Sequence, residues 1–258
     1  MSSLSIELVA RLDACGVHWA ARGIGRRAMC LQQGHVPGDW PQAFPDALAA
    51  MPRGRLRRLD RIAVWLGFPH AHYAVLPWQA FRHPTDCEAL AQALFDEWFE
   101  GAGGERCVAV ADAPYGAPRL AVACEAQLLD GLRELLHDDG LRMAQCLPLL
   151  EVALARFSAR LLPDCAFALN EPQALTCIHR RDGQWSAVAS LRSAPGTGIR
   201  QRLAAVEVLL GEAPPTTLVA ATDAALAPAD GDVRAGQWLG SMQPWAADGA
   251  PSGSAGAA

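Results

Sequence analysis

Short segments in which apolar and polar residues alternate recur along the first half of the chain. The clearest are residues 17–21, 27–31, 61–67, 72–78, 106–113 and 119–125. Alternation with a period of two is the pattern of a strand with one buried face. Turn residues separate the two members of each successive pair, so we expect three pairs of adjacent antiparallel strands.

Helical spacing and further strands follow in a repeated order. Helices are predicted at 42–51, 84–99, 126–140, 148–162 and 196–211. Strands are predicted at 142–146 and 216–222, and residues 165–193 supply three more. The order of antiparallel strands, helix, strand and helix occurs before residue 162 and again, in shorter form, from Cys165. The sequence therefore predicts an α/β (α+β) fold of two related halves, with mixed sheets flanked by helices.

The composition fits a folded globular protein with an unstructured end. Of the 258 residues, 51% are hydrophobic, which supplies a large core. We assign residues 1–162 to the first half, 163–243 to the second, and 244–258, which are mostly Gly, Ala and Ser, to a disordered tail. A net charge of -5 argues against a nucleic-acid partner. We find no signal peptide and no apolar run of about 18 residues that would span a membrane.

The positions of cysteine, histidine and arginine limit the kinds of metal or binding site that the chain can form. The eight cysteines include no Cys-x-x-Cys pair, so we expect no zinc site and a reducing compartment. His70 and His72 would share one face of a strand, but no third metal ligand can be assigned to them. The stretch 53–61 holds five arginines, which could contact an acidic partner or anionic lipid headgroups, or could form an ordinary solvated surface.

Two stretches carry a resemblance to known proteins. The strand ending in Val-Leu-Pro-Trp-Gln at 75–79 and the succession of strand, helix, Gly-Leu step and Pro-Leu helix at 118–154 are similar to the pilus assembly PilM family. They also resemble the cytoplasmic domain of the type II secretion GspL family. The resemblance covers roughly residues 15–222 and implies two ribonuclease H-like, or actin-like, halves.

The resemblance also implies a function. We expect a non-catalytic cytoplasmic scaffold of a type IV pilus or type II secretion-like assembly platform, located in the cytoplasm at the inner face of the inner membrane. It would bind a segment of an inner-membrane partner and connect it to a secretion ATPase, without a cofactor. GspL proteins carry a membrane helix, which we do not find here, so we expect this chain to be closer to the PilM arrangement or to be a component whose membrane part is a separate polypeptide. Candidate anchors for a partner are Trp40, Trp78 and Trp238.

The alternative is a nucleotide-binding actin-like ATPase or kinase-like enzyme with atypical phosphate loops. Active members of the actin-like class bind phosphates with Asp-x-Gly-x-Thr turns. Here Asp182 and Gly183 form a hairpin turn, but bulky Trp185 replaces the Thr, and the matching turn at 22–26 contains neither Asp nor Thr. No Walker-type loop is available, because the chain contains no lysine.

One further anion site is compatible with the sequence. Gly196, Thr197 and Gly198 open the helix predicted at 196–211, and backbone N–H groups at a helix start can hold an anion. The structural alternative is a loop in which Thr197 is the N-cap of the helix. If Mg-ATP binds this protein, Gly196, Thr197, Gly198 and Asp182 are the residues that we expect to contact it.

Overall fold

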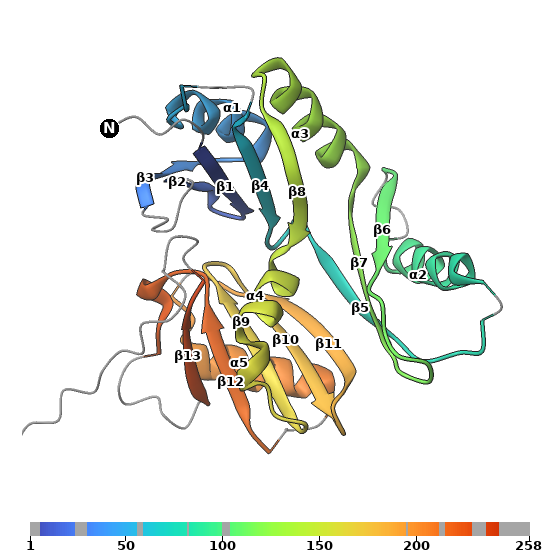
Figure 1. Ribbon diagram of the computed structural model, residues 1–258. Helices are drawn as coiled ribbons and strands as arrows, with labels where there is room; N and C mark the ends of the chain where they lie inside the picture. Colours follow the sequence, from blue (N-terminus) through green and yellow to red (C-terminus); the bar gives the residue numbers. More distant parts are fainter. Residues whose placement is uncertain are drawn as a thin grey trace, which may run out of the picture.

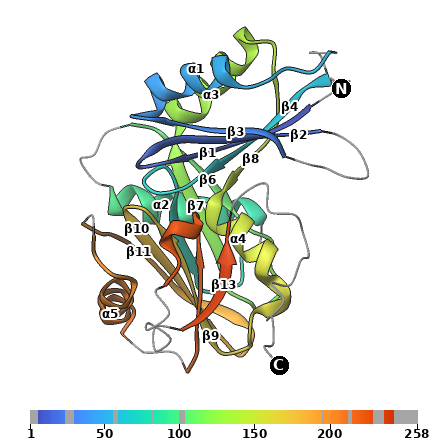
Figure 2. The same cartoon turned by 90° about the vertical axis from the view of Figure 1, so that its left-hand side faces the viewer.

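Two five-stranded mixed sheets and a smaller three-stranded sheet form the protein (Figures 1 and 2). The structure is a computed structural model that describes residues 6–23, 30–55, 59–81, 83–99, 104–194, 196–211, 215–228 and 236–242. Across these residues no helix is both long and apolar enough to cross a membrane.

The first sheet has the strand order β3-β2-β1-β4-β8. Its first three strands form an antiparallel meander, while β4 is parallel to β1 and β8 is parallel to β4. The strand bounds are Ile6–Asp13 for β1, Gly16–Gly23 for β2, Cys30–Pro37 for β3, Arg61–Leu66 for β4 and Arg142–Pro148 for β8.

The second sheet repeats this order as β11-β10-β9-β12-β13, with the same pattern of antiparallel and parallel pairs. Its strands are β9 at Cys165–Glu171, β10 at Ala174–Arg181, β11 at Gln184–Arg192, β12 at Thr217–Ala221 and β13 at Gln237–Ser241. The predicted α/β fold with two related halves is therefore confirmed. The boundary at residue 162 stays a prediction, and it falls just before β9. The predicted tail, 244–258, lies outside the described residues.

The third sheet lies between β4 and β8 in the sequence. It is antiparallel, in the order β5-β7-β6, and consists of β5 at His72–Leu76, β6 at Arg106–Val110 and β7 at Arg119–Glu125. One face carries α2, Pro84–Trp98, whose Phe95 and Ala91 are buried against β5 and β7 residues.

The predicted pairing of the segments 61–67 and 72–78 is wrong. β4 lies between β1 and β8 in the first sheet, whereas β5 pairs with β7. The chain leaves the first sheet at Gly67, whose N–H donates to the carbonyl of Leu12 at 2.8 Å. The chain then turns, with the N–H of His70 donating to the Gly67 carbonyl at 2.8 Å, and the next strand begins in a different sheet.

Helices cover the sheets and complete the core. Helices α1, Trp40–Ala50, and α3, Ala126–Asp138, pack on one face of the first sheet; α3 buries Leu128, Leu132 and Leu136 at a spacing of four residues. Helix α4, Leu149–Phe157, and the 3-10 turn η2, Ser158–Arg160, lead into the second half. Helix α5, Ile199–Leu210, packs on the second sheet, and a short 3-10 turn η3, Ala224–Leu226, follows β12.

Candidate partner-binding groove

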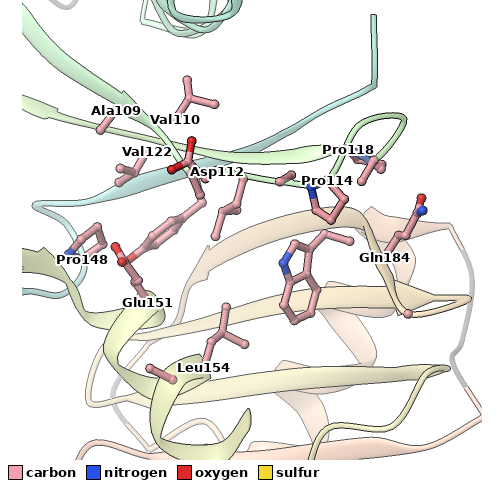
Figure 3. A pocket seen from close by; sticks show the side chains of 18 of the residues that line it. Ala109, Val110, Asp112, Pro114, Pro118, Val122, Pro148, Glu151, Leu154 and Gln184 are labelled. Atoms are coloured by element: carbon pink, nitrogen blue, oxygen red, sulfur yellow. The ribbon is translucent and has the colours of Figure 1, made fainter. Parts of the chain in front are cut away.

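A groove of about 750 Å³ lies between the three-stranded sheet, helix α4 and the β10–β11 turn. Figure 3 shows Val110 and Pro114 of the β6–β7 hairpin on one side and Glu151 and Leu154 of α4 on the other. Its lining is mainly apolar: Tyr73, Ala109, Val110, Ala111, Ala113, Pro114, Tyr115, Ala117, Pro118, Leu120, Val122, Pro148, Leu154, Ala155 and Trp185. Segments far apart in the sequence meet here, so the groove depends on the packing of both halves.

The charged side chains that line the groove are all acidic. They are Asp112 of the hairpin, Glu151 of α4 and Asp182 of the β10–β11 turn, and no arginine or histidine lines the groove. Figure 3 shows the Asp112 carboxylate turned away from α4, on the same side of the hairpin as Val110. An apolar surface with an acidic rim favours a ligand that is apolar and carries positive charge.

Aromatic residues stand at the hairpin that borders the groove. Tyr115 is 90% exposed, and its ring meets that of Trp78, which is 41% exposed, edge to face at 5.4 Å between centroids. Trp185 is partly buried in the lining, and the Arg180 guanidinium lies 5.6 Å from the centre of its ring. Exposed aromatic side chains beside an apolar groove are typical of protein-binding surfaces.

The three predicted tryptophan anchors are placed differently. Trp78 is exposed beside the groove, as an anchor must be. Trp40 packs on the large core of the first sheet and Trp238 on the smaller core under α5. The sequence does not distinguish these positions, because in each case the tryptophan lies next to a Gly, a Pro or a strand end.

Asp182 has a structural reason for its place in the chain. Among the described residues, Asp182 is the one non-glycine residue with a positive φ, which is 49°, and Gly183 follows with a φ of 77°. This pair of left-handed residues forms the tight turn between β10 and β11, for which Asp-Gly is favoured. The Asp182 N–H donates to the Asp164 carboxylate at 2.9 Å.

Gly196, Thr197 and Gly198 lie at the other end of the second sheet. The N-cap of α5 is Gly198, not Thr197, and no side chain caps this helix start. The Thr197 carbonyl accepts a hydrogen bond from Arg202 Nε at 3.0 Å, and Arg202 Nη2 also donates to the carbonyl of Pro172 in the β9–β10 turn. The length of β10 separates this loop from Asp182, so the four residues do not come together in one site.

The β1–β2 and β9–β10 turns occupy matched positions in the two halves. Asp13 pairs with Gly16 at the first turn and Glu171 with Ala174 at the second, so both carboxylates end the first strand of their half. Sequence reasoning missed β1 and therefore Asp13. The available signal is the alternation of apolar Ile6, Leu8, Ala10 and Leu12 with the residues between them, of which only Val9 is apolar.

Each of these two turns is bonded to the opposite half of the protein. Arg11 Nε donates to Asp13 at 3.0 Å, and Arg11 Nη1 donates to the carbonyl of Thr222, beyond β12, at 3.0 Å. Glu171 accepts a hydrogen bond from the N–H of Phe68 at 2.9 Å. The two halves are therefore joined by buried polar contacts made in both directions.

Burial changes the protonation of the groups near these turns. Burial raises the pKa of Glu171 to about 7, and the hydrogen bond from Phe68 acts in the opposite direction. Burial also lowers the pKa of His18 to about 4, helped by the charge of Arg11, while Asp13 opposes the change. The His18 ring stacks on that of His35, with centroids 4.0 Å apart.

The remaining sequence candidates have structural roles where they are described. His72 packs against the ring of Phe99, and the described residues contain no cluster of His, Cys, Asp and Glu that could hold a metal ion. In the arginine-rich stretch, Arg53 forms an ion pair with Asp139, and residues 56–58 lie outside the described part.

Solved structures with the same arrangement of elements identify the fold. A Bacteroides thetaiotaomicron protein described as having an actin-like ATPase fold and unknown function matches with a TM-score of 0.60 and 13% identity, covering 94% of this chain and 93% of that one. The chain has the actin-like fold. No protein-family model and no curated protein sequence matches it.

Two further solved structures belong to pilus and secretion systems. One is a PilM–PilN type IV pilus biogenesis complex, with a TM-score of 0.58, 14% identity and coverage of 93% of this chain and 88% of that one. The other is the cytoplasmic domain of EpsL, an inner-membrane component of the type II secretion system of Vibrio cholerae. It has a TM-score of 0.54, 12% identity and coverage of 91% and 88%. The resemblance predicted from the sequence is confirmed at the level of the fold.

Proposed function

We propose that this protein is a non-catalytic scaffold of a type IV pilus or type II secretion-like assembly platform. It binds a short segment of an inner-membrane partner in the groove between the β6–β7 hairpin, helix α4 and the β10–β11 turn. We further propose that it acts at the cytoplasmic face of the membrane and connects this partner to a secretion ATPase.

The groove is the observation that carries the proposal. It has room for several side chains of an extended segment, its lining is mainly apolar, and exposed Tyr115 and Trp78 extend the apolar surface at its edge. Glu151 and Asp182 provide negative charge for basic residues that accompany an apolar segment in the partner. The PilM and EpsL structures support the proposal because proteins with this fold are known from both kinds of assembly.

The test is a two-hybrid screen of the full chain against the cytoplasmic segments of inner-membrane pilus and secretion proteins from its source bacterium. We expect one segment to interact. Glu151→Arg, which reverses charge in the groove, and Ala155→Arg, which fills it, should each abolish that interaction. Glu134→Arg on α3 and Ala204→Arg on α5 are exposed controls that should preserve it. An interaction that survives both groove variants would refute the site.

The nucleotide alternative has its own measurement. Thermal unfolding with and without millimolar Mg-ATP reports binding, because a ligand at 100 times its Kd stabilises the folded state by about 2.7 kcal/mol. We expect no shift of the midpoint. A clear shift would favour the nucleotide-binding alternative, and Gly196, Thr197, Gly198 and Asp182 would then be mutated one by one.

A further inference from the structure

Strand β6 is an end strand of the three-stranded sheet (Figure 1) and has the features of a pairing edge. It reads Arg-Cys-Val-Ala-Val and contains no proline, and its one charge, Arg106, is at its start. Natural edge strands are usually protected by proline, bulges or inward-pointing charges, because their unpaired N–H and C=O groups can accept another strand. In the described residues, β6 pairs with β7 alone.

The ladder with β7 shows which backbone groups of β6 face outward. The N–H of Ala111 donates to Leu120, and the N–H of Ala126 donates to Glu105. Hydrogen-bonded pairs alternate along an antiparallel ladder, so odd-numbered residues of β6 bond to β7. Arg106, Val108 and Val110 therefore direct their N–H and C=O groups to the free edge.

Side-chain charges select one register for a second strand on this edge. In an antiparallel two-fold pair centred on Ala109, Val108 lies opposite Val110 of the other copy, and Arg106 lies opposite Asp112. Both symmetry-related ends then bring together opposite charges, and the outward-facing backbone groups of the two strands meet. A pair centred one residue earlier would place Arg106 opposite Val110, leaving both charges without a partner.

Neighbouring side chains agree with this arrangement. Val108 and Val110 pack towards α2, and the Arg106 guanidinium lies 4.2 Å from the centre of the Phe99 ring at the end of α2. Asp112 lies on the same side of the hairpin as Val110 in Figure 3. Trp98, next to Phe99, is 52% exposed and adds apolar surface at the Arg106 end of the strand.

We infer that two copies of this chain associate through β6, which pairs with β6 of the second copy in an antiparallel register centred on Ala109. The pairing joins the two three-stranded sheets into one six-stranded sheet. The inference does not rest on the proposed function, because it is argued from the free edge of β6 alone, although Ala109, Val110 and Asp112 also line the groove.

The register can be tested by disulfide cross-linking. Residue 109 of each copy lies on the axis as a non-hydrogen-bonded pair, with Cα atoms about 4.5 Å apart, which a disulfide can span. We expect Ala109→Cys to give a covalent dimer under mild oxidation. The native Cys107 is also exposed on the same strand, but in this register it lies opposite Ala111 of the second copy and should not link to Cys107 of that copy. Equal cross-linking of the unsubstituted protein would overturn this register.

Charge exchange tests the same register in solution without cross-linking. Arg106→Asp and Asp112→Arg should each weaken the dimer about tenfold or more, because each places like charges opposite one another twice. The double variant should restore the dimer. The measurement is sedimentation equilibrium over a wide range of protein concentration. A chain that stays monomeric throughout, or single variants that leave the dimer unchanged, would overturn the inference, whatever the outcome of the partner screen.

Discussion

Replacing Glu171 with Gln tests the account of the contacts between the two halves. Glu171 is 2% exposed, and its carboxylate accepts a hydrogen bond from the Phe68 N–H. Gly67 is packed against it so closely that a Cβ atom at position 67 would collide with Glu171 Oε1. Burial disfavours the ionised form of this carboxyl group and raises its pKa.

The pH dependence of stability follows from the raised pKa. Below pH 4.5 the carboxyl group is protonated in both the folded and the unfolded state. As the pH rises from 4.5 towards 7, the unfolded state loses its proton first, so the free energy of unfolding falls. With a folded-state pKa of about 7 against an ordinary value of 4.5, the loss is on the order of 3 kcal/mol and is complete above pH 7.

Urea unfolding followed by tryptophan fluorescence, at several pH values from 4.5 to 8, measures this loss. Glu171→Gln keeps the size and the acceptor oxygen but cannot ionise, so the variant should lack this part of the pH dependence. Glu134→Gln, on the exposed face of α3, is the matched control and should retain it. If the wild type and Glu171→Gln show parallel curves across this range, the carboxyl group is not held as described.

Two further substitutions test the packing of the β9–β10 turn and of helix α3. Arg202→Met removes a buried guanidinium that donates to Asn170 Oδ1 at 3.0 Å and to the carbonyl of Glu171 at 2.8 Å, and we expect the free energy of unfolding in urea to fall by at least about 3 kcal/mol. The exposed Arg133→Met should cost less than about 1 kcal/mol, and an equal loss in both variants would contradict the role of Arg202. Gly131→Ala would ordinarily stabilise helix α3 by about 1 kcal/mol, but its Cβ would lie 2.7 Å from Trp40 Cη2, so we expect a lower thermal midpoint. Trp40→Phe in the same background should recover part of the difference, and a midpoint that rises in the single variant would show that Trp40 moves freely.

Much of the fold could be predicted from the sequence because the patterns that indicate it lie within short segments. The β6–β7 hairpin follows from two alternating runs joined by Pro-Tyr-Gly, and α3 follows from leucines four residues apart. The repeated order of elements was sufficient to predict two related halves. These features depend on neighbours within a few residues, which is the range over which a hydrophobic pattern carries information.

The parts that escaped prediction depend on distant residues. The burial of Arg11 in β1 is one example, because its guanidinium donates to the carbonyl of Thr222 in the other half. The groove likewise combines the hairpin near residue 112, α4 near 151 and the turn at 182. No pattern within one segment indicates that these residues meet, so the candidate site had to come from the structure. Residues 196–198 do precede the start of α5, as the sequence predicts, but Asp182 is not beside them.

The two matched turns differ in their buried charged groups, although the two halves share one strand order. At the β1–β2 turn, buried Arg11 pairs with Asp13 and reaches the second half, whereas at the β9–β10 turn Glu171 forms no ion pair with a described residue and accepts a hydrogen bond from a backbone N–H of the first half. At each turn, a side chain of the protein makes the hydrogen bond that joins the two halves. Any ligand that entered between these turns would have to replace at least one of those bonds, and an unpaired buried Arg11 or Glu171 would oppose its binding. The groove beside α4 requires no such exchange, because Glu151 and Asp182 are already exposed, and this difference favours the groove as the surface that receives a partner.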